Sequence, residues 1–135
     1  MKKILIVEDH PANRKLARDI LLRAGYEVLE ARNAREGIRQ ANSFQPALIV
    51  MDIQLPGMSG LAATKVLKDD SATSRIPILA LSAHAMPGDH ERFLEGGCDA
   101  YLSKPLRYAR FLSLVHQLLT EKPRTLGEGC NLKIS

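Results

Sequence analysis

Residues 48–60 have the sequence LIVMDIQLPGMSG, and this stretch decides the fold of the chain. Residues 47–51 form an unbroken apolar run, which predicts a strand. Such a run is typical of a strand buried on both faces of a parallel sheet. The strand ends in Asp52, and the next residues include Pro56 and two glycines, which favour a loop. A helix is then predicted over residues 61–68. The stretch is therefore a strand, a loop and a helix, with a carboxylate where the strand ends.

The same alternation of strand and helix extends to both sides of this unit. Further apolar runs predict strands over residues 3–7, 26–31, 77–82 and 99–103. Helices are predicted from Pro11 to a stop at Gly25, after the capping pair Asn33 and Glu36, over residues 87–95 and over residues 107–119. Five strand–helix units in a row predict an α/β fold: a doubly wound, flavodoxin-like (βα)5 domain with a five-stranded parallel sheet of order 2-1-3-4-5.

Four of the predicted strands end in polar side chains, at the edge of the sheet where such folds bind ligands. These side chains are Glu8, Asp9, Asp52, Ser82 and Lys104. Each one alone also fits a helix cap, a turn or a solvated surface, but together they bring three carboxylates, a hydroxyl group and an ammonium group to one place. Carboxylates so close together repel one another, and Mg²⁺, which prefers oxygen ligands, relieves that repulsion. A carboxylate beside Mg²⁺ and a lysine is suited to accept a phosphoryl group as an acyl phosphate.

The composition indicates one soluble domain. The chain has 135 residues, of which 45% are hydrophobic, and this suits a single domain with a substantial core. Its longest apolar runs fall far short of the roughly 20 residues that a membrane-crossing helix needs, and no signal-peptide pattern follows the N-terminal Met1-Lys2-Lys3. The two cysteines, Cys98 and Cys130, make neither a disulfide framework nor a zinc site. A reduced, cytoplasmic setting is therefore expected.

The net charge of +4 is concentrated within residues 14–39, where there are seven cations and four anions. Only three tyrosines and three phenylalanines are present, which argues against a surface that stacks on nucleic-acid bases. The basic segment therefore indicates either a surface for an acidic protein partner or an ordinary solvated helix face. The candidates for docking an upstream phosphodonor protein are three cations predicted on one face of the first helix, opposite Leu16 and Ile20: Arg14, Lys15 and Arg18.

Four stretches of the chain resemble the receiver domain of two-component response regulators. They are ILIVED (residues 4–9), LIVMDIQLPGMSG (48–60), PILALSA (77–83) and GGCDAYLSKP (96–105). The resemblance covers about residues 1–120. It is nearest to stand-alone receivers of the cell-division type and to receivers fused to hybrid kinases, and residues 51–70 are the most informative for that subgroup.

The resemblance implies a role for each matching acidic residue. Asp52 would accept the phosphoryl group and would also be a metal ligand. Asp9 would bind Mg²⁺ directly, and Glu8 would bind it through a water molecule. The backbone carbonyl of Gln54 would complete the protein's share of the metal ligands. The resemblance thus implies Mg²⁺ as the cofactor.

It also implies roles for the residues after the fourth and fifth strands. Ser82 and Lys104 would each contact an oxygen of the phosphoryl group. Tyr101 would be an aromatic residue that changes position together with Ser82 on phosphorylation. Lys104 and Pro105 would be joined by a cis peptide bond, which only bonds to proline form at low cost.

The function implied is a phosphoacceptor signalling module of a two-component or phosphorelay system. A sensor histidine kinase or a histidine phosphotransfer protein would phosphorylate Asp52, and the phosphorylated form would change its binding to a downstream protein. No direct contact with nucleic acid or membrane is expected. The receiver domain is expected over residues 1–122, with a flexible tail over residues 123–135. Because these bounds leave no room for an output domain, either the output is by protein contact or the chain is a fragment of a longer protein.

A phosphatase with a similar sheet is the alternative function. Such enzymes also use an aspartate nucleophile, Mg²⁺ and a lysine, but they need a second aspartate two residues later as general acid and base. Gln54 stands there and cannot transfer a proton, so no enzyme activity is expected beyond self-catalysed phosphorylation and dephosphorylation of Asp52. Three departures from the family pattern are present: Ser82, where threonine is common; His10, where asparagine or aspartate is common; and Gln54 and His84, at two positions that tune hydrolysis of the phosphoryl group in the family. His84 either orders or blocks water there or is an exposed loop histidine.

Overall fold

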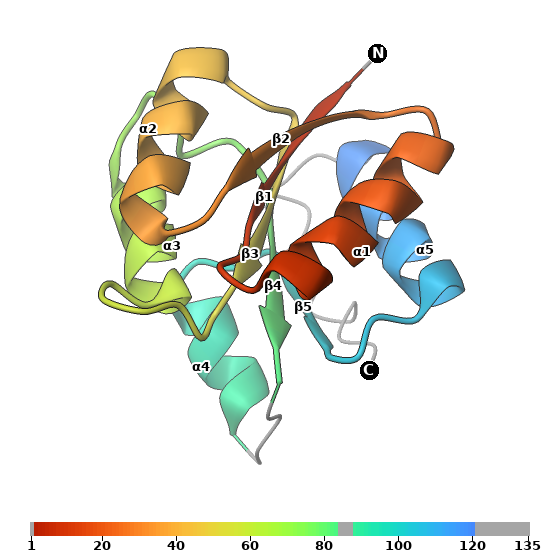
Figure 1. Ribbon diagram of the computed structural model, residues 1–135. Helices are drawn as coiled ribbons and strands as arrows, with labels where there is room; N and C mark the ends of the chain where they lie inside the picture. The colour runs from red at the N-terminus through yellow and green to blue at the C-terminus, as the bar shows by residue number, and fades with distance from the viewer. Residues whose placement is uncertain (1, 84–87, 121–135) are drawn as a thin grey trace.

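The computed structural model describes residues 2–83 and 88–120. Within them, parallel strands alternate with helices along the chain (Figure 1). The strands are β1 (Lys3–Val7), β2 (Glu27–Ala31), β3 (Leu48–Asp52), β4 (Ile78–Ser82) and β5 (Ala100–Ser103). The helices are α1 (Pro11–Arg23), α2 (Ala34–Phe44), α3 (Gly60–Asp69), α4 (Asp89–Glu95) and α5 (Tyr108–Thr120).

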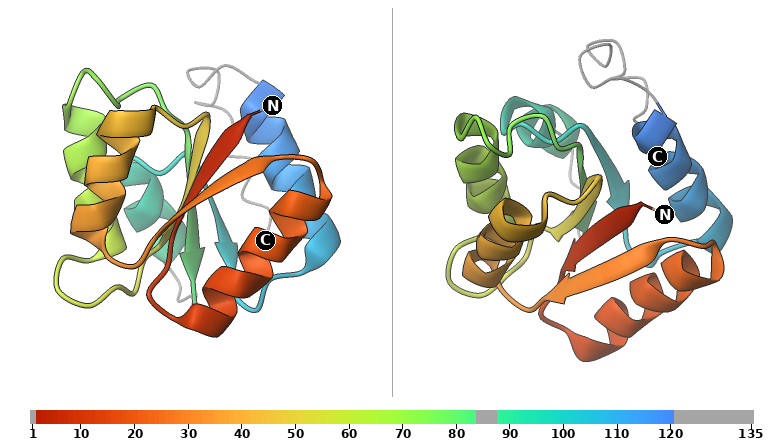
Figure 2. Two further views of the ribbon diagram at one scale, coloured as in Figure 1. Left: turned by 45° about the horizontal axis from the view of Figure 1, so that its top comes forward. Right: turned by 90° about the horizontal axis from the view of Figure 1, so that it is seen from above.

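The strands form one parallel sheet in the order β2-β1-β3-β4-β5, which confirms the predicted doubly wound fold. Helices α1 and α5 cover one face of the sheet, and α2, α3 and α4 lie on the other (Figures 1 and 2). The register places Asp52 beside Leu81 and Ser82 beside Ser103. The carboxyl ends of β1, β3, β4 and β5 therefore meet at one edge of the sheet.

Both faces of the sheet are buried, which explains why the central strands β1, β3 and β4 are apolar at every position except one end of each, where Lys3, Asp52 and Ser82 lie. In β1, Ile4 and Ile6 belong to a core shared with α1 and α5. The alternate residues Leu5 and Val7 belong to a second core shared with α2 and α3. Helix α4 contributes Phe93 to a third, smaller cluster with Ala80 of β4.

Local signals in the sequence account for the helix starts. Pro11 is the first residue of α1. The Asn33 side chain accepts a hydrogen bond from the Glu36 N–H (2.8 Å), and α2 is therefore capped as predicted. The Glu36 carboxylate reaches back one residue further than in a standard capping box and accepts from the Arg32 N–H (2.8 Å). Ser59 caps α3 as Asn33 caps α2, through the Ala62 N–H (3.1 Å).

Helix α1 corrects one sequence prediction. Leu16 was expected on the buried face, but its relative exposure is 44%, whereas Ile20 is 6% exposed. The buried stripe of α1 is narrow and consists of Ala17, Ile20 and Leu21, so that Leu16 lies one step around the helix. There it lines a small hollow with Asn13 and Leu106.

Among the described residues, no helix is both long and apolar enough to cross a membrane. The tail predicted over residues 123–135 lies outside the described part of the chain, as does Pro87 at the predicted start of the fourth helix.

Candidate functional site

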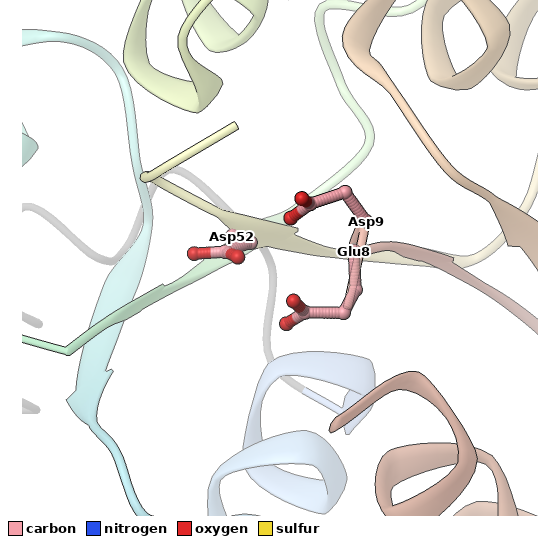
Figure 3. Close-up of side chains that lie close together, drawn as sticks. All are labelled: Glu8, Asp9 and Asp52. Carbon is pink, nitrogen blue, oxygen red and sulfur yellow. The ribbon is translucent and has the colours of Figure 1, made fainter. Parts of the chain in front are cut away.

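Three carboxylates meet where β1 and β3 end. Each of Glu8, Asp9 and Asp52 offers an oxygen atom, and these atoms all lie within 4.8 Å of one another. Figure 3 shows the three side chains pointing into a common space. Glu8 and Asp52 are each only 2% exposed, whereas Asp9 is exposed to solvent. The cluster is thus buried on one side and open on the other, so that a ligand can enter it.

Lys104, directly after β5, bridges the two buried acids. Its Nζ lies 3.0 Å from Glu8 Oε1 and 3.2 Å from Asp52 Oδ2. The peptide bond from Lys104 to Pro105 is cis. The lysine places one positive charge against two negative charges, and the third carboxylate, that of Asp9, adds a further negative charge at the open side.

The surroundings of Asp52 oppose its ionisation. Burial is the largest effect and, with the nearby charge of Glu8, raises the pKa of Asp52 to about 6, although Lys104 and the Gln54 N–H favour the charged form. For Lys104, burial lowers the pKa, but the hydrogen bond with Glu8 and the charges of the two acids outweigh it, so that the pKa is raised. Lys104 therefore stays protonated, and the cluster favours the arrival of a further cation.

The donor set fits Mg²⁺, because it consists of carboxylate oxygens within reach of one another. Within residues 2–83 and 88–120, the carboxylate of Asp9 has no hydrogen-bond partner, and it is therefore available to a metal ion. Glu8 is already engaged, since its Oε1 accepts from Lys104 and its Oε2 accepts from the His10 N–H at 3.2 Å.

The Gln54 side chain crosses from the loop after β3 to the end of β4. Its Oε1 accepts a hydrogen bond from the Ala83 N–H (3.1 Å), and its Nε2 lies 3.5 Å from the Oγ of Ser82. Ser82 itself is fully buried. The sequence interpretation assigned a role to the backbone carbonyl of Gln54 and missed this side-chain bridge, because nothing in the local sequence shows that the two loops are adjacent.

Tyr101 lies in β5 beside Ala80 of β4. Its half-buried ring packs edge-on against Phe93 of α4, with 5.4 Å between the ring centroids and an interplanar angle of 71°. The structure thus brings Tyr101 to the strand next to Ser82, and its part in switching stays a prediction. His84, the second position expected to tune hydrolysis, lies outside the described residues.

The proposed docking residues are engaged in contacts of their own. Arg14 Nε lies 3.1 Å from Glu30 Oε1, and its Nη1 donates to the backbone carbonyl of Glu8 (2.9 Å). Arg18 also pairs with Glu30, at 3.1 Å. Lys15 forms a surface pair with Asp19 at 2.9 Å. Arg14 therefore supports the loop that carries the acid pair, while Lys15 is the most exposed of the three.

Comparison with known proteins agrees with this geometry. The family model described as the response regulator receiver domain matches residues 4–116. The polar-differentiation response regulator DivK of Brucella anthropi is 48% identical over 118 residues, which cover 87% of this chain and 96% of that protein. The DivK of Brucella ovis is 47% identical over the same shares.

Solved structures show the same likeness. The receiver domain of the sensor histidine kinase PA1611 from Pseudomonas aeruginosa, determined with a magnesium ion coordinated in its active site cleft, has a TM-score of 0.83 and 32% identity over 89% of this chain and 98% of that one. The chemotaxis protein CheY4 of Vibrio cholerae has a TM-score of 0.83 and 28% identity over 87% and 98%. The chain belongs to the response regulator receiver domain family, whose members are phosphoacceptor signalling modules.

Proposed function

We propose that this receiver accepts a phosphoryl group on Asp52 in the presence of Mg²⁺, from a sensor histidine kinase or a histidine phosphotransfer protein. The observation that carries the proposal is the position of Asp52 at the end of the central strand β3, beside Glu8 and Asp9 and 3.2 Å from the Lys104 ammonium group. Phosphorylation then changes the affinity of the chain for a downstream protein. The receiver domain is proposed to span residues 1–122, since α5 ends at Thr120.

The transfer itself needs no proton from the chain. An oxygen of the ionised Asp52 carboxylate attacks phosphorus, and the new O–P bond forms as the P–N bond to the donor's imidazole breaks. The electron pair of that bond returns to the imidazole nitrogen, and the donor leaves as a neutral histidine because its other ring nitrogen carries a proton. The Lys104 ammonium group pairs with a phosphoryl oxygen, and Glu8 holds that ammonium group in place. Mg²⁺, held by Asp9, Asp52, the Gln54 carbonyl and, through water, Glu8, would supply charge neutralisation.

Labelling with a small phosphodonor tests this assignment. The protein is incubated with acetyl phosphate and Mg²⁺, and its intact mass is measured over time. We expect the wild type to gain one phosphoryl group. Asp52→Asn should gain none, because an amide is a poor nucleophile. The control Asp69→Asn, whose side chain is exposed on α3, should be labelled normally. Labelling of Asp52→Asn at the wild-type yield would exclude Asp52 as the acceptor, and rapid multiple turnover of the phosphodonor would favour the phosphatase alternative.

Switching is proposed to run through Ser82 and Tyr101. A phosphoryl oxygen attracts the Ser82 hydroxyl through a charge-assisted hydrogen bond, and the half-buried Tyr101 turns into the space that this movement opens. Ser82→Ala should then still be phosphorylated, but its partner affinity should no longer depend on phosphorylation. If the variant keeps the full difference in affinity, switching does not depend on this pair.

A further inference from the structure

The Gln54 side chain is the contact that ties the phosphoacceptor loop to the end of β4. Its backbone N–H donates to Asp52 Oδ1 (3.0 Å), while its carboxamide accepts from the Ala83 N–H (3.1 Å) and has its Nε2 3.5 Å from Ser82 Oγ. One residue thus contacts Asp52 through its main chain and the two residues at the end of β4 through its side chain.

We propose that the Gln54 carboxamide is a latch that holds Ser82 and Ala83 in their unphosphorylated positions and opens when Asp52 is phosphorylated. The inference rests on the proposed function of Asp52 and adds to it a residue that sets how readily the receiver switches.

The chemistry of the groups supports this exchange of partners. The donors at the end of β4 are the Ser82 hydroxyl and the Ala83 N–H, and the latter is held by a neutral amide oxygen. A phosphoryl group on Asp52 brings three charged acceptor oxygens close to them, and hydrogen bonds to charged acceptors are roughly twice as strong as bonds to neutral ones. The phosphoryl group therefore displaces the carboxamide, and Gln54 opposes switching until it does so.

The length and charge of glutamine suit this role. Asparagine is one methylene group shorter and would not span from the loop after β3 to Ala83. Glutamate would lose the donor that faces Ser82 and would add a charge beside Glu8, Asp9 and Asp52. Gln54 is itself exposed and belongs to none of the core clusters formed by the described residues, so its replacement should leave the fold intact.

The test uses solvent exchange of backbone amides, measured by NMR on the full chain. Gln54→Met keeps the length of the side chain and removes both hydrogen-bonding groups, and Gln54→Ala removes the side chain altogether. The matched control is Gln40→Met, which removes a carboxamide that donates to the Glu30 carbonyl (2.8 Å) at the β2 edge of the sheet. In both Gln54 variants the Ala83 amide should exchange about two- to tenfold faster, which corresponds to one net hydrogen bond.

The same spectra report on switching. In the Gln54 variants without phosphodonor, the Ser82, Ala83 and Tyr101 signals should move towards those of the wild type treated with Mg²⁺ and beryllofluoride, a phosphoryl mimic. Gln40→Met should match the untreated wild type. If the wild type responds to beryllofluoride and the Gln54 variants show neither faster Ala83 exchange nor shifted signals, the proposal that Gln54 holds Ser82 and Ala83 in place is wrong. If the wild type does not respond, the proposed function is wrong, and the switching role of Gln54 falls with it.

Discussion

At the scale of single residues, Asp52 occupies surroundings that disfavour its own charge. It is buried, next to Glu8, and only partly compensated by Lys104, so that its pKa is raised to about 6. The folded state therefore binds a proton at Asp52 more tightly than the unfolded state does. It follows that the ionised carboxylate lowers the free energy of unfolding at neutral pH. This loss of stability disappears once the pH falls below the ordinary pKa of an aspartate, because Asp52 is then protonated in both the folded and the unfolded state.

Asp52→Asn should for this reason stabilise the protein in buffer free of divalent cations. At pH 7.5 the gain in the free energy of unfolding should reach up to about 3 kcal/mol, the equivalent of a pKa raised by roughly two units. The gain should shrink as the pH falls from 6 to below 4, where Asp52 is neutral in both states. Urea denaturation at several pH values measures it, and a variant less stable than the wild type at pH 7.5 would contradict the prediction.

Asp9 and Glu8 should differ in their contribution to Mg²⁺ binding. Asp9→Ala should weaken the affinity for Mg²⁺ about tenfold or more, because an exposed carboxylate with no hydrogen-bond partner in the described residues can bind the ion directly. Glu8→Ala should have the smaller effect, since both oxygens of Glu8 are engaged by Lys104 and the His10 N–H. Titration calorimetry with Mg²⁺ gives both affinities, and the reverse order would exchange the two roles.

At the scale of elements, helix α3 begins against the carbonyl group of the phosphoacceptor itself. A Cβ atom on Gly60 would overlap the Asp52 carbonyl oxygen and would lie 2.8 Å from the Cα of Ile53. Both neighbours are backbone atoms, which cannot rotate away. The first residue of α3 therefore fixes how closely the helix approaches the end of β3.

Gly60→Ala should destabilise the protein by about 1–3 kcal/mol or more, as overpacking at a rigid contact does. It should also slow labelling of Asp52, because the helix can move away only by shifting the strand end that carries the acceptor. Thermal unfolding and the rate of labelling by acetyl phosphate provide the two measurements. Lys65→Ala, at an exposed position of the same helix, is the control and should leave both unchanged. Wild-type behaviour of Gly60→Ala would mean that α3 has room to move.

The elements themselves could be predicted because their signals are local. The strand over residues 3–7 was predicted with its observed bounds, since an apolar run needs no knowledge of its neighbours. Tyr26 was assigned to the second strand, but β2 begins at Glu27, because the Tyr26 N–H donates to the Leu21 carbonyl (3.1 Å) and closes the end of α1. Gly60 was placed in a loop, but it begins α3, because Ser59 supplies the cap.

The contacts that could not be predicted join residues distant in the sequence. Lys68 donates to the Ile76 carbonyl (2.8 Å) and to Asp99 (3.0 Å), which lies 31 residues away, so that α3 is bound to the segments before β4 and before β5. The pairing of Arg14 with Glu30 and the bridge from Gln54 to Ala83 are of the same kind. Each depends on the direction of a long side chain, which neither periodicity nor strand order specifies.

At the scale of the whole molecule, α1 begins at Pro11, two residues after Asp9, and carries the proposed docking residues. Arg14 is unsuited to a test of docking, since its guanidinium group donates to the Glu8 carbonyl and its loss would disturb the cluster. Lys15 and Arg18 are better choices, because neither contacts the acids of the site. Docking on α1 can thus be examined separately from the chemistry.

The double variant Lys15→Glu/Arg18→Gln should slow phosphoryl transfer from a protein donor several-fold at low salt, mainly through the association rate. Labelling by acetyl phosphate should stay at the wild-type rate. The control is Lys65→Glu on α3, which lies on the other face of the sheet (Figure 1). Equal slowing with both donors would show damage to the site, and no slowing with either would identify α1 as an ordinary solvated surface.

The hydrogen bond from Lys104 to Glu8 joins residues that are 96 positions apart in the sequence. A chain that ends between Asp52 and Lys104 has the acceptor aspartate but lacks the lysine, and a fragment that begins between Glu8 and Asp52 has the aspartate but lacks the acid that holds the lysine. Under the proposed function, such a chain lacks part of the charge arrangement that receives the phosphoryl group. Under that proposal, efficient phosphorylation requires a chain that has closed its sheet, so that phosphorylation also reports on the integrity of the protein.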